Sequence, residues 1–268
     1  MQLPSSPAWS FCIKHYLFLK STSSKTLRLF SDGNTGLVFI LKGQLKVKDS
    51  GGSDENLPAV FVYGQLNGFQ DIYSKDGTEI LIVVFHPHGF FRFSGLPADE
   101  IKGQIIDAHF IYGNQLYSLL DNLRTAISYA QSIWLLETHF SALLKSPINH
   151  NDPLGHVVRS IVQLKGQTTV KELTGSTGYS ERKLERLFRA AIGISPGKYL
   201  QIVRLHHFLS LIRSGKETSS LTIAGIESGY YDQPHLIHHF RQATGLTPTE
   251  YLSSANPLTV NLLAVDPS

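Results

Sequence analysis

Three charged residues share one face of a helix predicted between Ser180 and Gly193. Arg182, Glu185 and Arg186 lie opposite the apolar residues of that helix. An arginine can hold O6 and N7 of guanine through two hydrogen bonds, and a glutamate can accept from N4 of cytosine. Like charges four residues apart on this face are mildly destabilising in a helix, so a role in solubility alone is less natural. The pattern favours contacts with DNA bases.

A second helix, further along the chain, offers Gln233, His235 and His238 on its outer face. A glutamine matches N6 and N7 of adenine. Pro234 cannot recognise a base by hydrogen bonding, and a neutral His238 attracts phosphate weakly, so this helix is expected to contribute less specificity or more backbone positioning. Five further cationic residues are candidates for phosphate contacts, which position a protein without recognising sequence: Lys183, Arg189, Lys198, Arg204 and Arg241.

Both helices belong to copies of one short pattern that recurs at a constant offset of 52 residues. Phe188, Arg189, Gly193, Ser195, Pro196 and Tyr199 return as Phe240, Arg241, Gly245, Thr247, Pro248 and Tyr251. In each copy a glycine can end a first helix in the left-handed conformation, and Ser180 or Asp232 can then cap a second helix. Two copies are too few for a solenoid, so the pattern indicates a duplicated helix-turn-helix unit.

Residues from about 153 to 252 resemble the DNA-binding domain of AraC/XylS-type transcriptional regulators. The most specific matches are Gly229-Tyr230, Asp232-Gln233, Phe240-Arg241, Gly245-Leu246-Thr247-Pro248 and Tyr251. The resemblance implies seven helices, with a long helix joining two helix-turn-helix units. It implies double-stranded DNA and RNA polymerase as partners, favours an activator, and assigns base contacts to the outer face of the first recognition helix. The chain departs from the family at Pro234, where many members have a polar residue, and at His238, where many have arginine.

The segment from Pro196 to about Arg213 is predicted to be the joining helix. About 18 residues would extend about 27 Å at 1.5 Å per residue. Successive major-groove windows on one face of B-DNA are about 34 Å apart. A rigid helix of this length could hold two recognition helices one turn of DNA apart, so that one chain contacts two adjacent segments.

Charge is distributed unevenly along the chain. Residues 155–252 hold 12 Lys and Arg against 7 Asp and Glu, whereas the remainder holds 12 against 14. A basic C-terminal part behind a slightly acidic N-terminal part is typical of a nucleic-acid-binding domain joined to another domain. The single cysteine, Cys12, excludes an intrachain disulfide and a cysteine-based zinc site. The sequence has no membrane-length apolar run and no signal-peptide pattern, so a cytoplasmic protein is expected.

Before residue 98 the sequence predicts β-structure. Five short strand-like runs are separated by Gly- and Asp-rich turns: residues 16–19, 37–41, 45–48, 59–63 and 79–85. This spacing is typical of a small barrel or double-sheet roll. AraC-like regulators commonly carry an N-terminal cupin-like barrel, which would sense a small-molecule effector or mediate dimerisation. We therefore expect an α+β fold with two domains.

The predicted organisation has five parts. These are a cupin-like barrel at 1–98, a helical extension at 99–146, a linker at 147–153, the DNA-binding domain at 154–253, and a tail at 254–268. A short helix is expected from about Leu96 to Ile101. A stripe of apolar residues in the extension is expected to be packed core or a homodimer contact: Ile127, Ala130, Trp134, Leu135 and Ala142. The tail has no periodic pattern and is expected to be loosely ordered.

The alternative function is a metal-binding cupin enzyme or sensor with an appended DNA-binding module. His86 and His88 flank Pro87 and suggest a metal site, but zinc or iron would need a third protein ligand, and none stands at the usual spacing. The pair His235 and His239 lacks an H-E-x-x-H motif. We therefore expect a strand-to-turn exit at residues 86–88, no metal or cofactor, and no catalytic residues.

Overall fold

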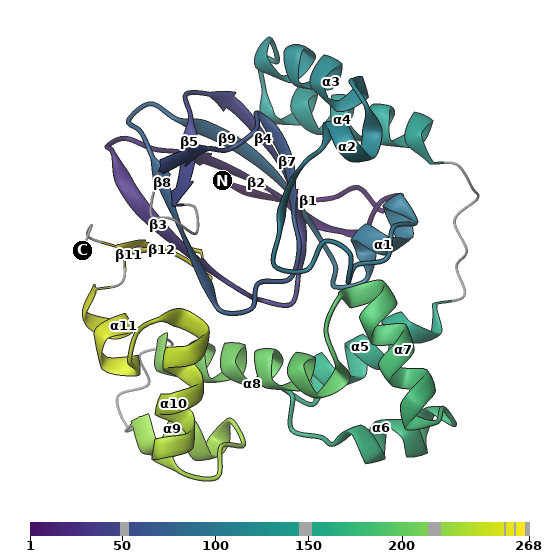
Figure 1. The fold of residues 1–268 in the computed structure, drawn as a ribbon, viewed down its shortest axis with the longest axis vertical. Coiled ribbons are helices and arrows are strands. Elements are labelled where there is room, and N and C mark those ends of the chain that lie inside the picture. The colour runs from purple at the N-terminus through teal and green to yellow at the C-terminus, as the bar shows by residue number, and fades with distance from the viewer. Residues whose placement is uncertain (49–53, 145–151, 214–220, 255, 260, 266–268) are drawn as a thin grey trace.

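The computed structural model describes residues 1–48, 54–144, 152–213, 221–254, 256–259 and 261–265 (Figure 1). A β-rich N-terminal part forms the upper half of Figure 1, and C-terminal helices form the lower half. The predicted α+β fold, with a cupin-like barrel and a helical C-terminal domain, is confirmed.

Two antiparallel sheets build the barrel. The first has the strand order β1 (Gln2–Pro4), β2 (Ile13–Lys20), β9 (Glu79–Phe85), β4 (Gly36–Lys42), β7 (Val60–Tyr63) and β10 (Ile105–Asp107). The second has the order β11 (Asn256–Thr259), β12 (Leu262–Val265), β3 (Lys25–Phe30), β8 (Phe69–Ser74), β5 (Leu45–Lys48) and β6 (Asp54–Asn56). All the strand pairs are antiparallel.

The first sheet is buried on both faces, which explains its continuous apolar runs. In β9, Ile80 and Ile82 pack into the barrel interior, whereas Leu81 and Val83 pack against the N-terminal helices. Successive side chains of a strand point to opposite faces, so a strand covered on both sides is apolar at every position. This is why the β9 run was easy to recognise in the sequence.

Four helices of the N-terminal part follow the strands, namely α1 (Gly89–Ser94), α2 (His109–Tyr112), α3 (Gln115–Arg124) and α4 (Tyr129–Leu143). The apolar stripe expected to be packed core or a dimer contact is mostly not core: only its Leu135 packs against the N-terminal core. α4 buries Ser132, Leu136 and Phe140 instead, while Ile127 is 93% and Trp134 63% exposed. The choice was ambiguous because α4 has apolar residues on more than one side.

The C-terminal domain contains, within the described residues, seven helices, as the resemblance implied. They are α5 (Pro153–Gln163), α6 (Val170–Thr177), α7 (Glu181–Ile192), α8 (Pro196–Arg213), α9 (Leu221–Glu227), α10 (Gln233–Thr244) and α11 (Pro248–Ser254). One apolar core lies around α7 and another around α10, and α8 contributes to both. In the part of the chain that the structure describes, no helix is long and apolar enough to cross a membrane.

The tail prediction is wrong for the described residues. Strand β12 pairs with β3 in an antiparallel register, from Leu262 opposite Leu29 to Val265 opposite Thr26. The tail thus extends a barrel sheet that begins more than 200 residues earlier in the chain. Strands β3 and β8 were also missed, because their alternating sequences contain charged or polar residues on the face that turns away from the barrel interior.

Two further boundaries differ from the expectation. Residues 98–103 form turns rather than a short helix, and the main-chain N–H of Ala98 donates to the Ala190 carbonyl of α7 at 2.7 Å. The segment 99–146 is not purely helical, because β10 pairs with β7 in the first sheet. Of the predicted linker, residues 147–151 lie outside the described residues.

Cys12 provides a direct test of this packing. The side chain is fully buried, and burial raises the pKa of its thiol to about 12. Only the thiolate attacks disulfide reagents. We expect the native protein to react negligibly with Ellman's reagent at pH 8 over minutes, and to release one equivalent of chromophore immediately in guanidinium chloride. Rapid stoichiometric reaction of the native protein would contradict the packing around Trp9 and Cys12.

Candidate nucleic-acid interface

The first helix-turn-helix unit consists of α6 and α7, and local hydrogen bonds fix its turn. Thr169 Oγ1 accepts from the Glu172 N–H at 3.2 Å, and the Glu172 carboxylate accepts from the Thr169 N–H at 2.8 Å. This capping box satisfies two donors that would otherwise be unpaired at the start of α6. Gly178 has φ 68°, and Ser180 caps α7 by accepting from the Lys183 N–H. The roles predicted for Gly178 and Ser180 are confirmed.

The outer face of α7 is strongly cationic. Four cations are exposed on this face: Arg182, Lys183, Arg186 and Arg189. Glu185, on the same face, is partly buried. The four cations line a groove of about 610 Å³, to which Asp99 of the N-terminal part also contributes. Glu185 Oε2 lies 3.6 Å from Arg189 Nε. Three of the four cations therefore have no carboxylate within ion-pair distance among the described residues, and an anionic ligand can reach all four.

Lys183 has a defined position before any ligand binds. Its ammonium nitrogen lies 3.9 Å from the centre of the Tyr179 ring. A cation over an aromatic face is weakly stabilised, typically by about 0.5–1 kcal/mol at an exposed site. This contact holds the side chain beside the start of α7, where a phosphate would also meet the positive end of the helix dipole.

The second unit, α9 and α10, repeats the local geometry with different side chains. Asp232 caps α10 by accepting from the His235 N–H at 2.8 Å, and Pro234 lies in the tolerated first turn. Gln233, His235 and His238 are all exposed. The face is therefore available as predicted, but Pro234 and His238 stand where α7 has Arg182 and Arg186.

The third histidine of α10 has a different role. His239 is buried at 7% exposure, and its Nδ1 lies 2.8 Å from the Tyr230 hydroxyl. Burial is the main cause that lowers the pKa of His239 to about 4, and nearby cations lower it further. Among the described residues, no group of three His, Cys, Asp or Glu side chains could hold a metal ion.

The three remaining phosphate candidates differ in their surroundings. Arg204 is partly buried on α8, and its Nη2 donates to the Gly166 carbonyl at 3.0 Å. This bond ties the turn after α5 to the joining helix and gives Arg204 a structural role. Arg241 is exposed in the last turn of α10. Lys198 is partly buried, and burial lowers its pKa. The phosphate contacts of all three stay predictions.

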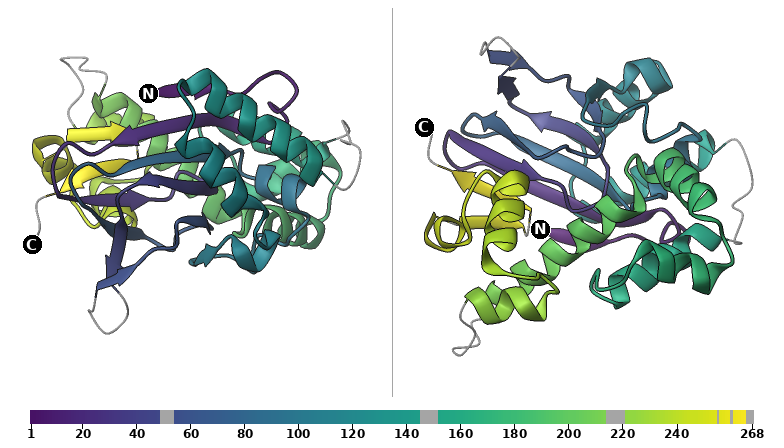
Figure 2. Two further views of the ribbon diagram at one scale, coloured as in Figure 1. Left: turned by 90° about the horizontal axis from the view of Figure 1, so that it is seen from above. Right: turned by 60° about the horizontal axis from the view of Figure 1, so that its bottom comes forward.

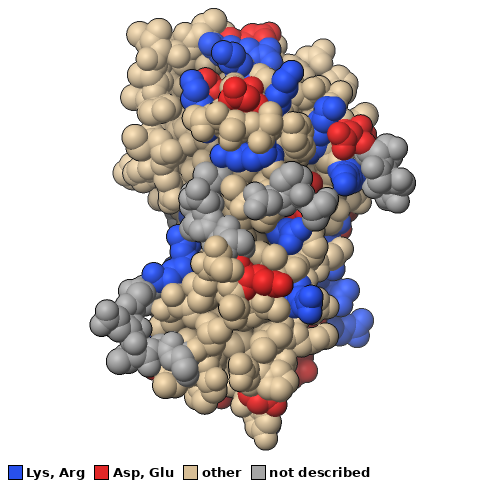
Figure 3. All heavy atoms as spheres, turned by 90° about the vertical axis from the view of Figure 1, so that its left-hand side faces the viewer, with Lys and Arg blue, Asp and Glu red and all other residues tan. Residues whose placement is uncertain are grey.

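The joining helix lies between the two units. Figure 2 shows α8 crossing the base of the molecule, with α6 and α7 at one end and α9 and α10 at the other. Its 18 residues match the predicted length. On the face drawn in Figure 3, basic and acidic side chains are interspersed over both halves, so no field of one sign covers that face. On the outer face of α7, by contrast, cations predominate.

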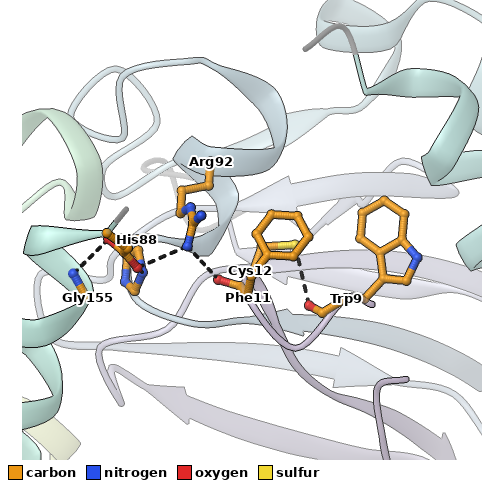
Figure 4. Close-up of polar contacts among 7 residues, drawn as sticks. Trp9, Phe11, Cys12, His88, Arg92 and Gly155 are labelled. Atoms are coloured by element: carbon orange, nitrogen blue, oxygen red, sulfur yellow. Dashed lines mark hydrogen bonds and ion pairs between the residues drawn. The ribbon is translucent and has the colours of Figure 1, made fainter. Parts of the chain in front are cut away.

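An ion-pair cluster joins the barrel to the C-terminal domain (Figure 4). Asp152 caps α5 by accepting from the Gly155 N–H, and its Oδ2 lies 2.8 Å from His88 Nε2 and 3.0 Å from Arg92 Nη1. Burial opposes the charge of Asp152, but the His88 hydrogen bond and the nearby positive charge hold its pKa well below the usual range. Arg92 also donates to the Phe11 carbonyl. The H-P-H segment thus supplies an interdomain contact through His88.

A cavity of about 790 Å³ lies between the barrel and the helices α5 and α8. Apolar side chains of the barrel interior, such as Leu17, Phe61 and Ile82, line its inner part. Polar and charged residues also contribute to its wall, namely Lys14, His15, Asp32, Asn34, His86 and His206. The cavity can hold a small molecule with an apolar body and polar groups.

The interdomain contacts were not predicted from the sequence. Asp99, Asp152 and Arg92 belong to no motif, and each is a single charged residue outside the apolar stripes. Tyr231 could have been found from the sequence, because the second copy has one residue more than the first between the turn glycine and the N-cap. Tyr230 packs in the core, and the extra residue Tyr231 is 91% exposed.

Comparisons with known proteins identify two regions. Residues 173–254 match the family described as "Helix-turn-helix domain", and residues 1–107 match the "Domain of unknown function (DUF6597)". A curated relative, an "Uncharacterized HTH-type transcriptional regulator" of Haemophilus influenzae, is 31% identical over 87 residues. That match covers 32% of this chain and 28% of the relative's length.

Solved structures that align with this chain include ToxT from Vibrio cholerae. One ToxT structure aligns with 89% of this chain and 96% of its own, at 12% identity and a TM-score of 0.47. A ToxT structure with bound unsaturated fatty acid aligns with 88% and 93%, at 14% identity and a TM-score of 0.44. Ectoine synthase from P. lautus aligns with 32% of this chain and 61% of its own, at 11% identity and a TM-score of 0.25.

The buried His239 predicts a pH dependence of stability. An unfolded histidine titrates near pH 6.5, about two units above His239 in the folded state. The unfolded chain therefore binds the proton first, and the free energy of unfolding should fall as pH is lowered from about 6.5 to about 4. Burial also lowers the pKa of His86 to about 4, so His239→Leu should reduce this fall without abolishing it.

Urea unfolding at pH 7 and pH 5 measures this difference. His238→Leu, at the exposed neighbouring position, is the matched control and should retain the wild-type difference. Equal pH dependence in the His239 variant and the control would contradict the neutral, buried state of His239.

Proposed function

We propose that this chain, whose C-terminal part is an AraC-type helix-turn-helix domain, is a sequence-specific transcriptional regulator that contacts two adjacent major-groove segments. One observation carries the proposal. Two units with equivalent N-cap and glycine positions, each with an exposed outer helix face, stand at the two ends of an 18-residue helix. Each would present its second helix to the major groove, as helix-turn-helix proteins do.

The two units would contribute unequally. In α7, Arg182 and Arg186 can each hold a guanine, and Glu185 can accept from a cytosine. In α10, Gln233 suits adenine, while His235 and His238 are exposed and Pro234 offers no donor. The first unit would therefore supply most of the base recognition and electrostatic affinity, and the second would add a shorter block of preference.

The cavity between the barrel and α5 and α8 supports a small-molecule effector. Its inner wall is apolar, and its polar residues come from both the barrel and α8. A ligand there would contact both domains and could favour one arrangement of them over another, provided that it binds the two arrangements with different affinity. Family tendency favours an activator, for which RNA polymerase would be the protein partner.

Exposed apolar side chains on α4 and just before it support a homodimer. Ile127, which precedes the helix, is 93% exposed, and Trp134 and Tyr129 of α4 are 63% and 49% exposed. Large exposed apolar side chains grouped in one region commonly mark a protein interface. The metal-binding cupin enzyme is the less favoured alternative, because His88 is engaged by Asp152 at 2.8 Å rather than directed with His86 at a shared site.

Two arginines of α7 should respond differently to truncation. Arg186→Ala should cost roughly 1–3 kcal/mol on the preferred DNA and relax the preference at one base pair. Arg189→Ala should weaken binding to all sequences alike, because a phosphate contact carries no base information. The measurement is selection from a randomised DNA pool at fixed salt, followed by fluorescence anisotropy on matched and mismatched duplexes. Lys75→Ala, which removes a positive charge on an exposed barrel turn, is the control. Equal small losses of affinity on every duplex for all three variants would refute base recognition by Arg186.

A charge placed on the α4 face should prevent self-association. Trp134→Glu should convert a dimer to a monomer in sedimentation velocity at micromolar concentration, because burying an unpaired carboxylate at an interface is costly. Tyr73→Glu, at a 40% exposed aromatic of β8, is the matched control and should leave the dimer intact. A wild-type protein that sediments as a monomer at every concentration would exclude this interface.

A further inference from the structure

The core of the second helix-turn-helix unit is completed by a residue of the barrel. Phe30, the last residue of β3, is fully buried in the cluster that contains Phe208 of α8 and Phe240 of α10. Leu263 of β12 belongs to the same cluster. The second unit therefore shares its apolar core with two adjacent strands of the barrel, and α10 cannot tilt without displacing buried side chains.

A second contact lies at the C-terminal end of α10. The Phe69 ring and the Arg28 guanidinium pack directly against Gly245, where a β-carbon would lie 2.5 Å from one and 2.8 Å from the other. Arg28 is itself fixed, because it donates two hydrogen bonds of 2.7 and 2.6 Å to Asp71 and stacks 4.2 Å from the centre of the Phe69 ring. The end of the second recognition helix thus abuts a rigid pair of barrel side chains.

The first recognition helix meets the N-terminal part in the same way. The Ala190 carbonyl accepts from the Ala98 N–H at 2.7 Å, and a β-carbon at Gly193 would lie 2.7 Å from the Ala98 oxygen. Phe91 of α1 packs against the core of this unit. Gly193 and Gly245 are equivalent positions of the two copies, so the N-terminal part touches both recognition helices at the same point.

The joining helix is held between these two contacts. His206 of α8 donates from Nε2 to the Ser31 carbonyl at 3.0 Å, and the Tyr199 ring packs against Gly33. In Figure 1 the barrel lies over α8 along its length, from α7 to α10. The N-terminal part therefore contacts α7, α8 and α10 at separate points, with the cavity between the barrel and α8 among them.

We propose that the N-terminal domain is a brace that sets the distance and angle between the two recognition helices, with Phe69 and Arg28 as its positioning residues for the second one. These residues determine which spacing between two DNA blocks the protein accepts. The inference rests on the proposed function, since it requires both α7 and α10 to contact DNA. The competing explanation is that α8 alone holds the two units at a fixed separation.

DNA spacing separates the two explanations. Inserting one base pair moves the second block by about 3.4 Å along the axis and about 35° around it. A braced pair of helices cannot follow that change, whereas an unbraced second unit can pivot on α8. The two blocks are first obtained by selection from a random pool with the full-length wild-type chain, and duplexes are then made with the gap shortened or lengthened by one base pair.

The test uses the single variants Phe69→Ala and Asp71→Asn, the second of which releases Arg28. Phe69 is 41% exposed and the Asp71 side chain 37%, so both substitutions are at the surface. Phe110→Ala, at an 82% exposed phenylalanine of α2, is the matched control. Thermal unfolding of each variant is recorded, and a spacing result is taken from whichever variant melts like the wild type.

The expected result is a loss of spacing discrimination. Wild type and Phe110→Ala should lose about tenfold or more in affinity when the gap changes by one base pair, which corresponds to about 1.4 kcal/mol. Phe69→Ala and Asp71→Asn should keep near-wild-type affinity at the best gap but lose less than about threefold at the altered gaps. The same steep penalty in all four proteins would overturn the brace while leaving the two-helix function intact. Selection of a single DNA block would overturn the two-helix function and, with it, the brace.

Discussion

Burial of apolar side chains shared between distant parts of the chain is the constraint on which this structure depends. Each helix-turn-helix unit is a few short helices, too small to enclose a core by itself. The first unit recruits Phe91, and the second recruits Phe30 and Leu263. The long helix α8 belongs to both cores. As a result the cores of both units include residues from outside the unit, and α8 connects the two cores.

The polar contacts between the domains refine that arrangement. Asp152 both caps α5 and accepts from His88 and Arg92, so the start of the C-terminal domain is oriented by charges from the barrel side. These groups are largely buried, where an unpaired charge would be costly. The cavity lies beside this junction, and its wall includes Tyr199 and His206 of α8. A molecule inside it would contact the same helix that carries both recognition units.

The duplicated units have the same backbone but different surfaces. The turn glycines and N-caps agree because helix termination and capping depend on local residues. The outward faces diverge, since α7 carries three arginines and a lysine, whereas α10 carries Gln233, two exposed histidines and a single arginine, Arg241. Backbone repetition thus allows one unit to dominate electrostatically while the other retains the same geometry. The extra residue Tyr231 is likewise outside the core, which contains only Tyr230 at that turn.

The sequence by itself determined the elements whose causes are local. Helix caps, turn glycines, the length of α8 and the apolar runs of β4 and β9 follow from neighbouring residues, and so does the exposure of the α7 cations. Only the tertiary structure decided how β12 pairs with β3, which side of α4 is buried, and that His88 meets Asp152. These depend on contacts between residues tens to hundreds of positions apart. The periodicity of the sequence gives no information on such contacts. A strand that is polar on one face becomes ordered only when a partner strand satisfies the hydrogen bonds of its backbone.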